Sequence, residues 1–504
     1  MEGICKEQIK DGYLRITFDR EFNSILTPEI IDLLSKYKRI KFGNMFNQPV
    51  DNLPDSVEWI MFSCCFNQSV DKLPNSLKSV SFCQLFNQPI DNLPNSLINL
   101  EIIGDFNQPI DHLPNSLKTL EIAWDFDQPV DNLPSSLLSL EIISDFNHPV
   151  DYLPNSLTHF MITGTFNQMI NKLPNSLAHL TLRGKFNQPV DHLPNSITHL
   201  EFGNDFNQLI DNLPESLTHL VLGKDFNQPV DHLPNSITHL KFSESNGYCA
   251  FNQPVDKLSN SLTHLELVGS FNQPVDNLPG SIINIKLGGH FNQPIDHLPN
   301  SITHLEFGGY FNQSVDKLPN SLKSVSFCLR FNQSIDNLPN SLIDLEIRSD
   351  FNQPIDHLPN SLKTLYIGWR FNQSVDYLPN SITHLVIAGT FNKPVDNLPN
   401  SITHLEFGNK FNQPVDNLPN SITHLKIESE FNHPINNLPN SLTHLELKYK
   451  FNQQVDNLPE SIIFLCFGEC FDQHIQRFPK SLEKIVISKG YSHPLPDNIE
   501  IEKY

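Results

Sequence analysis

The sequence predicts a repeat solenoid, an array of similar short units that each contribute one β-strand to a parallel sheet. Three observations lead to this fold class. A twenty-residue unit recurs along almost the whole chain, its apolar residues recur at fixed positions, and one unit has too few of them to form a core alone. The units must therefore stack on one another to keep these side chains from water.

The repeat is set by phenylalanine. The chain has 504 residues, with 36 Phe and 38 Pro but only 20 Gly and 3 Trp. Phe recurs every twenty residues from Phe46 to Phe226 and, after a five-residue insertion, from Phe251 to Phe471. This gives 22 units close to FNQPVDNLPNSLTHLEFGxx, numbered here 1 to 20 from the Phe. Position 11 is Ser in all 22 units, and position 9 is Pro in 21, with Ser259 the exception.

Each unit is predicted to contain one short strand near its end. Apolar residues at positions 15 and 17 alternate with polar ones, as in Thr198-His199-Leu200-Glu201-Phe202, which is the pattern of a strand with one buried face. Successive strands must be parallel, because each unit returns the chain to the same point. Positions 1 to 9 hold too much Pro and Asn for a regular helix and are predicted to form extended segments and 3₁₀-like turns.

The first 45 residues are predicted to cap the array. Phe22-Asn23 begins a degenerate unit, in which Thr27-Pro28-Glu29 has the residues of a helix start before Ile30-Ile31-Asp32-Leu33-Leu34. Strands are predicted at 38–42 and at 14–18. At the other end, the chain is expected to leave the array as a polar tail to Tyr504.

The predicted organisation has four parts. They are an N-terminal cap with the degenerate repeat (1–45), ten repeats with an insertion at 243–250 (46–250), eleven repeats (251–470), and the last repeat with a C-terminal cap or tail (471–504). Residues 66–125 match 311–370 at 51 of 60 positions, so block duplication built part of the array. A residue that recurs can therefore report ancestry alone.

Two motifs carry a resemblance to known families. The segment Ser-Leu-x-x-Leu-x-Phe after Leu-Pro resembles the leucine-rich repeat core, and Phe-Asn-Gln-Pro-Ile, as at 106–110 and 291–295, resembles the FNIP repeat signature. The resemblance runs from residue 46 almost to the end of the chain. It implies a horseshoe or superhelix with its strands on the concave face, used for protein binding and without chemistry. FNIP proteins are repeat arrays of amoebae and giant amoeba-infecting viruses, some with an F-box-like segment in front.

Charge and cysteine usage exclude several classes of function. The formal net charge of −22 disfavours nucleic acid and anionic membranes as partners, since both select basic surfaces. Asp at position 6 in 19 units accounts for most of this charge and is interpreted as a turn residue that accepts backbone hydrogen bonds. The eight Cys residues have no metal-ligand spacing, and no apolar run suits a signal or a membrane span. We therefore expect reduced thiols and a cytoplasmic protein, in the host cytoplasm if the chain is viral.

Asn at position 2, in 20 of 22 units, and Ser at position 11 predict polar ladders. A backbone turn that is buried leaves N–H and C=O groups without partners, and an amide or hydroxyl repeated in every unit can satisfy them. The interpretation of both residues is structural.

Histidine at position 14, on the solvent side of the strand, is the main candidate for a binding face. Imidazole columns are predicted beside a position-16 column that includes Glu201. The histidines are His159, His179, His199, His219, His239, His264, His304, His384, His404, His424 and His444. Inherited copies of Thr-His-Leu, a binding face and a metal site are the three interpretations; metal is disfavoured because stacked rings preset no tetrahedron and no thiolate accompanies them.

Three aromatic residues complete the predicted concave binding face. Trp59 occupies position 14, Tyr366 an exposed strand position, and Trp369 position 19. Exposed aromatic side chains on a rigid sheet are common binding anchors. No catalytic residues, metal or cofactor are predicted, because Ser, His and Asp of each unit serve different faces of the array.

The function predicted from the sequence is a non-catalytic scaffold or adaptor that binds unidentified proteins through a long concave sheet. Two alternatives remain open at this point. One is a structural or packaging solenoid without a unique ligand, which the uniformity of the units favours. The other is an F-box-type ubiquitin-ligase adaptor, which rests on the family resemblance and on the helix expected near Pro28.

Overall fold

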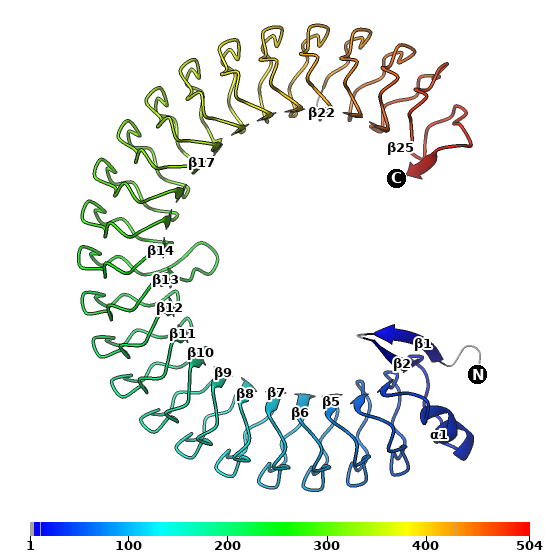
Figure 1. Ribbon diagram of the computed structural model, residues 1–504, viewed down its shortest axis with the longest axis vertical. Coiled ribbons are helices and arrows are strands. Elements are labelled where there is room, and N and C mark those ends of the chain that lie inside the picture. The colour runs from blue at the N-terminus through cyan, green and yellow to red at the C-terminus, as the bar shows by residue number, and fades with distance from the viewer. Residues whose placement is uncertain (1–4, 11, 429) are drawn as a thin grey trace. The chain divides into compact units, whose positions relative to one another are not determined.

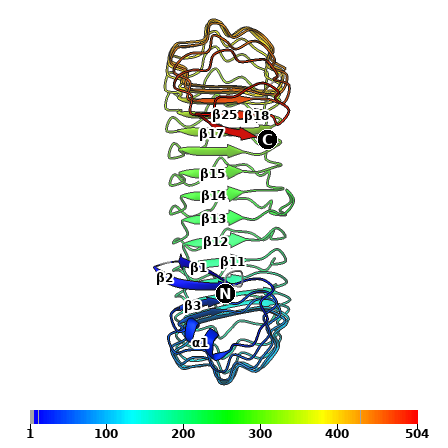
Figure 2. The same cartoon turned by 90° about the vertical axis from the view of Figure 1, so that its right-hand side faces the viewer.

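The computed structural model describes residues 5–10, 12–428 and 430–504. The chain divides into two compact units, Met1–Phe251 and Asn252–Tyr504. Within each unit the strands pair side by side and line its inner side, while turns form the outer side (Figures 1 and 2). The repeat solenoid predicted from the sequence is thus confirmed in both units.

The first unit begins with a hairpin and a single short helix. Its elements are β1 (Cys5–Lys10), β2 (Tyr13–Phe18), α1 (Pro28–Leu34), β3 (Arg39–Lys41), β4 (Trp59–Met61), β5 (Ser79–Gln84), β6 (Asn99–Gly104), β7 (Thr119–Trp124), β8 (Ser139–Ser144), β9 (His159–Gly164), β10 (His179–Leu182), β11 (His199–Phe202), β12 (His219–Leu222) and β13 (His239–Phe242).

The described residues of the second unit form strands and the turns between them, and no helix. The strands are β14 (His264–Leu267), β15 (Asn284–Leu287), β16 (His304–Phe307), β17 (Ser324–Leu329), β18 (Asp344–Ser349), β19 (Thr364–Ile367), β20 (His384–Ile387), β21 (His404–Phe407), β22 (His424–Ile427), β23 (His444–Leu447), β24 (Phe464–Phe467), β25 (Lys484–Ile487) and β26 (Glu500–Lys503).

The strands pair in parallel with a register of one repeat. His179 lies opposite His199 and Leu180 opposite Leu200, so every position of the repeat meets itself in the next unit. Position 15 and position 17 side chains, such as Leu200 and Phe202, are buried, as the alternation predicted. Residues at positions 14 and 16 stand on the opposite, partly exposed side of the strand.

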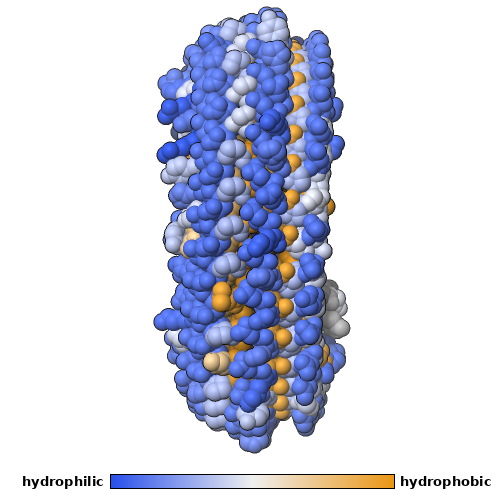
Figure 3. All heavy atoms as spheres, turned by 90° about the vertical axis from the view of Figure 1, so that its left-hand side faces the viewer, coloured by the Kyte–Doolittle hydropathy of each residue, from blue (hydrophilic) through white to orange (hydrophobic). Residues whose placement is uncertain are grey.

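A column of phenylalanine rings forms the centre of the core in each unit. The rings of Phe106 and Phe126 lie 6.2 Å apart, and those of Phe351 and Phe371 lie 6.1 Å apart, nearly parallel in both pairs. All four rings are fully buried. Each such ring contributes roughly 1.5–3 kcal/mol through the apolar surface that it buries. On the side that Figure 3 shows, hydrophilic side chains dominate, and apolar groups appear as narrow lines and scattered residues between them.

Proline at position 9 begins a tight turn in each repeat. The carbonyl oxygen of Pro74 accepts a hydrogen bond of 3.1 Å from the backbone N–H of Leu77, and the same bond recurs from unit to unit. Ser259, which replaces the proline, accepts the same bond from Leu262 at 3.1 Å. The turn therefore needs the carbonyl group of position 9, to which proline adds a fixed φ angle. These segments are turns and extended chain, and the described residues contain no 3₁₀ helix.

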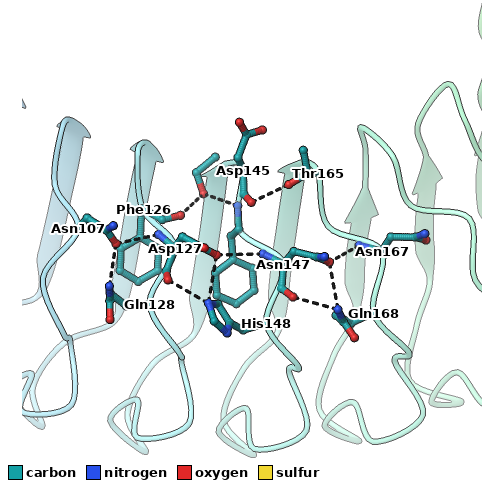
Figure 4. Close-up of polar contacts among 12 residues, drawn as sticks. Asn107, Phe126, Asp127, Gln128, Asp145, Asn147, His148, Thr165, Asn167 and Gln168 are labelled. Atoms are coloured by element: carbon teal, nitrogen blue, oxygen red, sulfur yellow. Dashed lines mark hydrogen bonds and ion pairs between the residues drawn. The ribbon is translucent and has the colours of Figure 1, made fainter.

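The predicted asparagine and serine ladders are confirmed. Asn147 Oδ1 accepts a hydrogen bond of 2.9 Å from the backbone N–H of Asn167, one repeat later (Figure 4). Asp127, which departs from the asparagine pattern, accepts the corresponding bond from Asn147 at 3.3 Å. The Ser156 hydroxyl donates to the Leu137 backbone oxygen of the preceding repeat at 2.5 Å. Most repeats are thus tied to the previous one at two polar points besides the strand, although the position-11 hydroxyls of Ser56 and Ser381 are buried without a hydrogen-bond partner.

The ends differ from the prediction in two places. The predicted helix and the strands near 14–18 and 38–42 are present, but β1 was not predicted and pairs antiparallel with β2. The expected polar tail is wrong, since β26 pairs in parallel with β25. Tyr491 also stacks on Phe471 with a centroid distance of 5.9 Å, so a further degenerate unit follows the last repeat. The spacing of twenty residues from Phe471 to Tyr491 was the signal for it.

Candidate binding face

Five histidines form a stacked column on the first unit. The rings of His199 and His219 lie 4.2 Å apart with an interplanar angle of 10°, and the other neighbouring pairs lie 4.2–4.3 Å apart. The five are His159, His179, His199, His219 and His239. Strand spacing of about 4.8 Å sets this distance, because each ring stands on its own strand.

Four histidines form a second column on the other unit. His384, His404, His424 and His444 stack with centroid distances of 4.2–4.3 Å. In this unit His264 and His304 both lie opposite Asn284, on the strand between theirs, and His304 lies opposite Ser324 on its other side.

The threonine that precedes every column histidine except His179, which follows Ala178, favours one tautomer. Thr198 Oγ1 donates a hydrogen bond to the Ala178 carbonyl oxygen at 3.2 Å and lies 2.9 Å from His199 Nδ1. Since the single hydroxyl proton is used on the carbonyl, Oγ1 can only accept from the ring, which places the ring proton on Nδ1. Thr423 and His424 repeat the arrangement in the second column.

Burial and stacking make His199 and His424 harder to protonate. Burial lowers the pKa of His199 below its ordinary value, and the charges of the neighbouring His219 and His179 lower it further. The pKa of His424 is lowered in the same way, first by burial and then by His444 and His404. His199 and His424 are therefore uncharged at neutral pH.

The columns are poorly arranged for metal binding. Neighbouring rings are almost parallel, so their Nε2 lone pairs point in the same direction and do not converge on one ion. Among the residues that the structure describes, no group of three or more His, Cys, Asp or Glu is placed to hold a metal ion.

Charges beside the second column compensate one another. Lys426 Nζ lies 3.0 Å from a Glu406 carboxylate oxygen and 3.0 Å from a Glu428 oxygen, and Lys448 lies 3.2 Å from Glu446. Position 16 thus alternates Glu, Lys, Glu across β21, β22 and β23. Beside the first column, Glu201 accepts from Arg183 Nε at 2.7 Å.

The three predicted aromatic anchors are placed differently from one another. Trp59 lies on β4 and has the Arg15 guanidinium 4.9 Å from its ring centroid. Tyr366 lies on the open side of β19, with Arg348 5.8 Å from its ring. Trp369 follows β19 in a turn and is 69 % exposed. Trp59 and Tyr366 therefore belong to the strand face, and Trp369 lies at its edge.

The position-6 aspartates have a different role from the one predicted. Asp71 Oδ1 accepts a hydrogen bond of 3.0 Å from the Asn92 side chain in the next repeat, and its other oxygen accepts from the Ser69 hydroxyl at 2.9 Å. The bond from Asn92 is the main reason that the pKa of Asp71 is lowered. Where position 7 is histidine, the ring replaces the amide, as in the 3.2 Å contact of His112 with Asp91. These carboxylates link side chains of neighbouring repeats rather than the backbone within a turn.

A family model described as FNIP Repeat matches more than half of the chain. The matches are 106–145, 186–212, 206–245, 251–290, 291–329, 331–369, 351–387, 371–410, 391–429, 411–450 and 431–470. The chain belongs to the FNIP repeat family.

Solved structures agree with the repeat fold. One similar structure is CroV588 of the giant virus CroV, described as a novel circular LRR protein; its TM-score is 0.71 at 34 % identity, over 99 % of this chain and 100 % of that one. YopM from Yersinia enterocolitica has the same fold at 19 % identity, with a TM-score of 0.51 over 94 % of this chain and 93 % of that one. Among curated proteins, no sequence matches.

The FNIP array therefore has a leucine-rich-repeat-like fold, which is typical of non-enzymatic protein-interaction scaffolds. Within the described part of the chain, no helix has both the length and the apolar character needed to cross a membrane.

Proposed function

We propose that this FNIP protein is a non-catalytic scaffold or adaptor whose partners are proteins that bind to the exposed sides of its strands. The observation that carries the proposal is where the repeats vary. Position 15, which is buried, holds only Leu, Ile, Val or Phe, whereas the partly exposed position 16 holds eight different residue types in 22 units. One backbone thus presents a different chemical surface on each stretch of strands.

This variation separates the proposal from a purely structural role. A packaging solenoid without a unique ligand gains nothing from Glu, Lys, Val, Tyr and Met at equivalent places, whereas a selective binding surface requires such differences. The net charge of −22 supports protein partners over nucleic acid, because an acidic surface repels phosphate. The segment on which the F-box alternative rests forms one seven-residue helix between two strands of the sheet and gives that alternative no specific support.

Proximity labelling in cells that naturally produce the protein tests this proposal. The inner-face variant replaces partly exposed strand residues of both units, and the control variant replaces three polar turn residues of the first unit. The inner set is His199→Ala, Glu201→Ala, His219→Ala, His404→Ala, Glu406→Ala and His424→Ala; the control set is His192→Ala, Asn212→Ala and His232→Ala.

We expect specific neighbours of the wild-type chain to be lost in the inner-face variant and kept in the control. A set of neighbours that is identical in all three proteins would count against the proposal. Self-association of the pure protein, measured by light scattering and unaffected by the inner set, would favour the structural alternative.

A further inference from the structure

Three glutamates form an uninterrupted row on the first unit. Glu101 of β6 lies opposite Glu121 of β7, which lies opposite Glu141 of β8. All three occupy position 16, so their side chains leave the same side of neighbouring strands, about 4.8 Å apart. We call these residues the acidic row.

The acidic row lacks the compensation that the second unit has. Among the described residues, no Lys or Arg forms an ion pair with Glu101, Glu121 or Glu141, and only the Ser81 hydroxyl donates to one of them, Glu101. Burial raises the pKa of Glu121, and the charges of Glu101 and Glu141 raise it further. A lysine in place of Glu121 would remove the repulsion between the carboxylates. In the second unit Lys426 has this place: it lies between Glu406 and Glu446 on the neighbouring strands and forms an ion pair with Glu406.

An apolar row runs beside the acidic row. Position 18 of the same strands holds Ile103, Ala123 and Ile143, which pair with one another in register. Ile143 is 36 % exposed and Trp124, at the end of β7, is 49 % exposed, whereas Ala123 between the two isoleucines is buried. The acidic row itself lines an open hollow of about 510 Å³, which Trp59 and Met61 also line. This part of the strand face is therefore amphipathic, with charge along one line and apolar surface along the next.

The duplicated block shows that the fold does not require this surface. Residues 66–125 and 311–370 differ at nine positions, and eight of the nine lie on the strand or in the residues just after it. Where the first block has Ile103, the second has Arg348, which pairs with its neighbour Glu346. Tyr366 stands in place of Glu121, so the acidic row is interrupted there. Apart from Pro89, which is Ser334 in the second copy, the turns of the two copies are kept, whereas the exposed chemistry of their strands is not.

The spacing of the glutamates within the acidic row matches the side-chain spacing of a bound helix better than that of a bound extended chain. Three glutamates on neighbouring strands span about 9.6 Å, close to the roughly 10.5 Å between residues i and i+7 of an α-helix. In an extended chain, side chains on one face repeat at about 6.7 Å and lose the register within two steps. Along the strand, positions 14 and 18 are about 13 Å apart, which accommodates a helix about 10–12 Å wide.

We propose that the face of β6, β7 and β8 docks an amphipathic α-helix of a partner protein, with a Lys or Arg stripe on the acidic row and an apolar stripe on the row of Ile103, Ala123 and Ile143. Charge complementarity carries this choice of occupant, since a basic stripe supplies the compensation that the chain itself lacks. The inference rests on the proposed function and gives that function one specific partner chemistry.

Fluorescence anisotropy with designed peptides on the full chain tests the proposal. The probe is a labelled peptide of about 18 residues with Leu on one helical face and Lys on the next. One control peptide has the same composition with a central proline, which breaks the helix. Another alternates Lys and Leu, which places the same charges on one face of an extended chain.

Two charge-matched protein variants accompany the peptides. One is Glu101→Gln, Glu121→Gln, Glu141→Gln; the other is Asp91→Asn, Asp111→Asn, Asp131→Asn in the turns of the same repeats. Thermal unfolding of both verifies that they are folded. We expect the glutamine variant to bind the helical peptide at least about tenfold more weakly than wild type, and the asparagine variant to bind within about twofold.

Equal weakening in the two variants would overturn the proposal, because it would show general attraction to negative charge. Preference for the alternating or the proline-containing peptide would overturn the helix. Failure of every peptide to bind wild type would also overturn this inference. The scaffold function would then still depend on the proximity labelling described above, which uses no peptide.

Discussion

The imidazole of His199 lies face to face with that of His219, with 4.2 Å between ring centroids, and its Nδ1 lies 2.9 Å from the hydroxyl oxygen of Thr198. The ring is therefore fixed at one edge and enclosed on its face by its neighbours. Protonation adds a positive charge to a column in which each neighbour would resist it.

We expect the pKa of His199, measured by NMR titration, to lie below the ordinary value of 6.5, because burial and the neighbouring imidazoles both disfavour the cation. Replacing one neighbour, as in His219→Asn, should raise it. A pKa of His199 that is unchanged by this substitution would show that the rings do not interact.

The same shift predicts how stability depends on pH. Since the folded pKa of His199 is lowered, the unfolded chain binds more protons as the pH falls through about 6.5, and the free energy of unfolding decreases there. Urea unfolding at pH 7.5 and 5.5 should therefore show a smaller pH effect in a His179→Asn, His199→Asn variant than in wild type. An equal effect in both proteins would assign the pH dependence to other groups.

Breaking one bond of the asparagine ladder should destabilise the array locally. Asn352 Oδ1 accepts from the backbone N–H of Asn372 at 2.9 Å, so Asn352→Ala removes the acceptor and should cost roughly 1 kcal/mol. Asn352→Asp keeps an acceptor, as Asp127 does in its own repeat, and should cost less. Hydrogen exchange at the Asn372 amide measures both; equal exchange in the alanine and aspartate variants would contradict this role.

Whole repeats should be easier to remove than single core side chains. Deleting 391–410 brings equivalent positions of the flanking repeats together and should leave a folded protein. Leu405 is 2 % exposed, so Leu405→Asp buries a carboxylate without a partner and should cost at least about 3 kcal/mol. Circular dichroism and hydrogen exchange compare the folding of the deletion variant with that of Leu405→Asp. Unfolding of the deletion alone would show that the repeat boundaries are misplaced.

Glycine should be required at 389 but not at 280. Gly389 has φ of +75°, and a Cβ there would lie 2.2 Å from the Trp369 backbone oxygen, so Gly389→Ala should cost roughly 1–3 kcal/mol. A Cβ at Gly280 would have no heavy atom within 4 Å, so Gly280→Ala should be neutral or stabilise by ~0.4–1 kcal/mol. Thermal unfolding of the two variants provides the comparison, and similar melting temperatures would refute it.

The rate of alkylation should differ between Cys466 and Cys470, which are four residues apart. Burial raises the pKa of Cys466 to about 11, whereas Cys470 is exposed. Iodoacetamide at pH 8 should therefore modify Cys470 first and Cys466 only after unfolding, as mass spectrometry of timed samples would show. Equal rates in the folded protein would mean that β24 opens readily.

The repeat itself made most of the fold predictable. A fixed spacing of twenty residues assigned Leu200 and Phe202 to the core and His199 to the open side of one strand, and parallel pairing followed from it. The structure of the two ends was not predicted fully, because the ends lack the repeat pattern. The β1 strand pairs antiparallel with β2, and Tyr491 takes the place of the Phe that begins each of the 22 repeats.

The candidate face was predictable only in part. The histidine columns follow from the sequence because identical residues recur at one position. Glu101, Glu121 and Glu141 recur in the same way, but their importance depends on the absence of compensating lysines around them, which becomes clear only from the contacts. The aspartate interpretation was wrong because the amide that reaches Asp71 comes from the next repeat, a neighbour that a search within one turn does not include.

The side-chain ladders also have a direction. Asn147 accepts from Asn167, and Leu137 accepts from Ser156, so in both ladders the earlier repeat supplies the acceptor and the later one the donor. Synthesis on the ribosome delivers repeats in that same order. Each repeat that emerges therefore finds its acceptors already in place on the repeat before it, and the array is suited to folding progressively from its N-terminal side during translation.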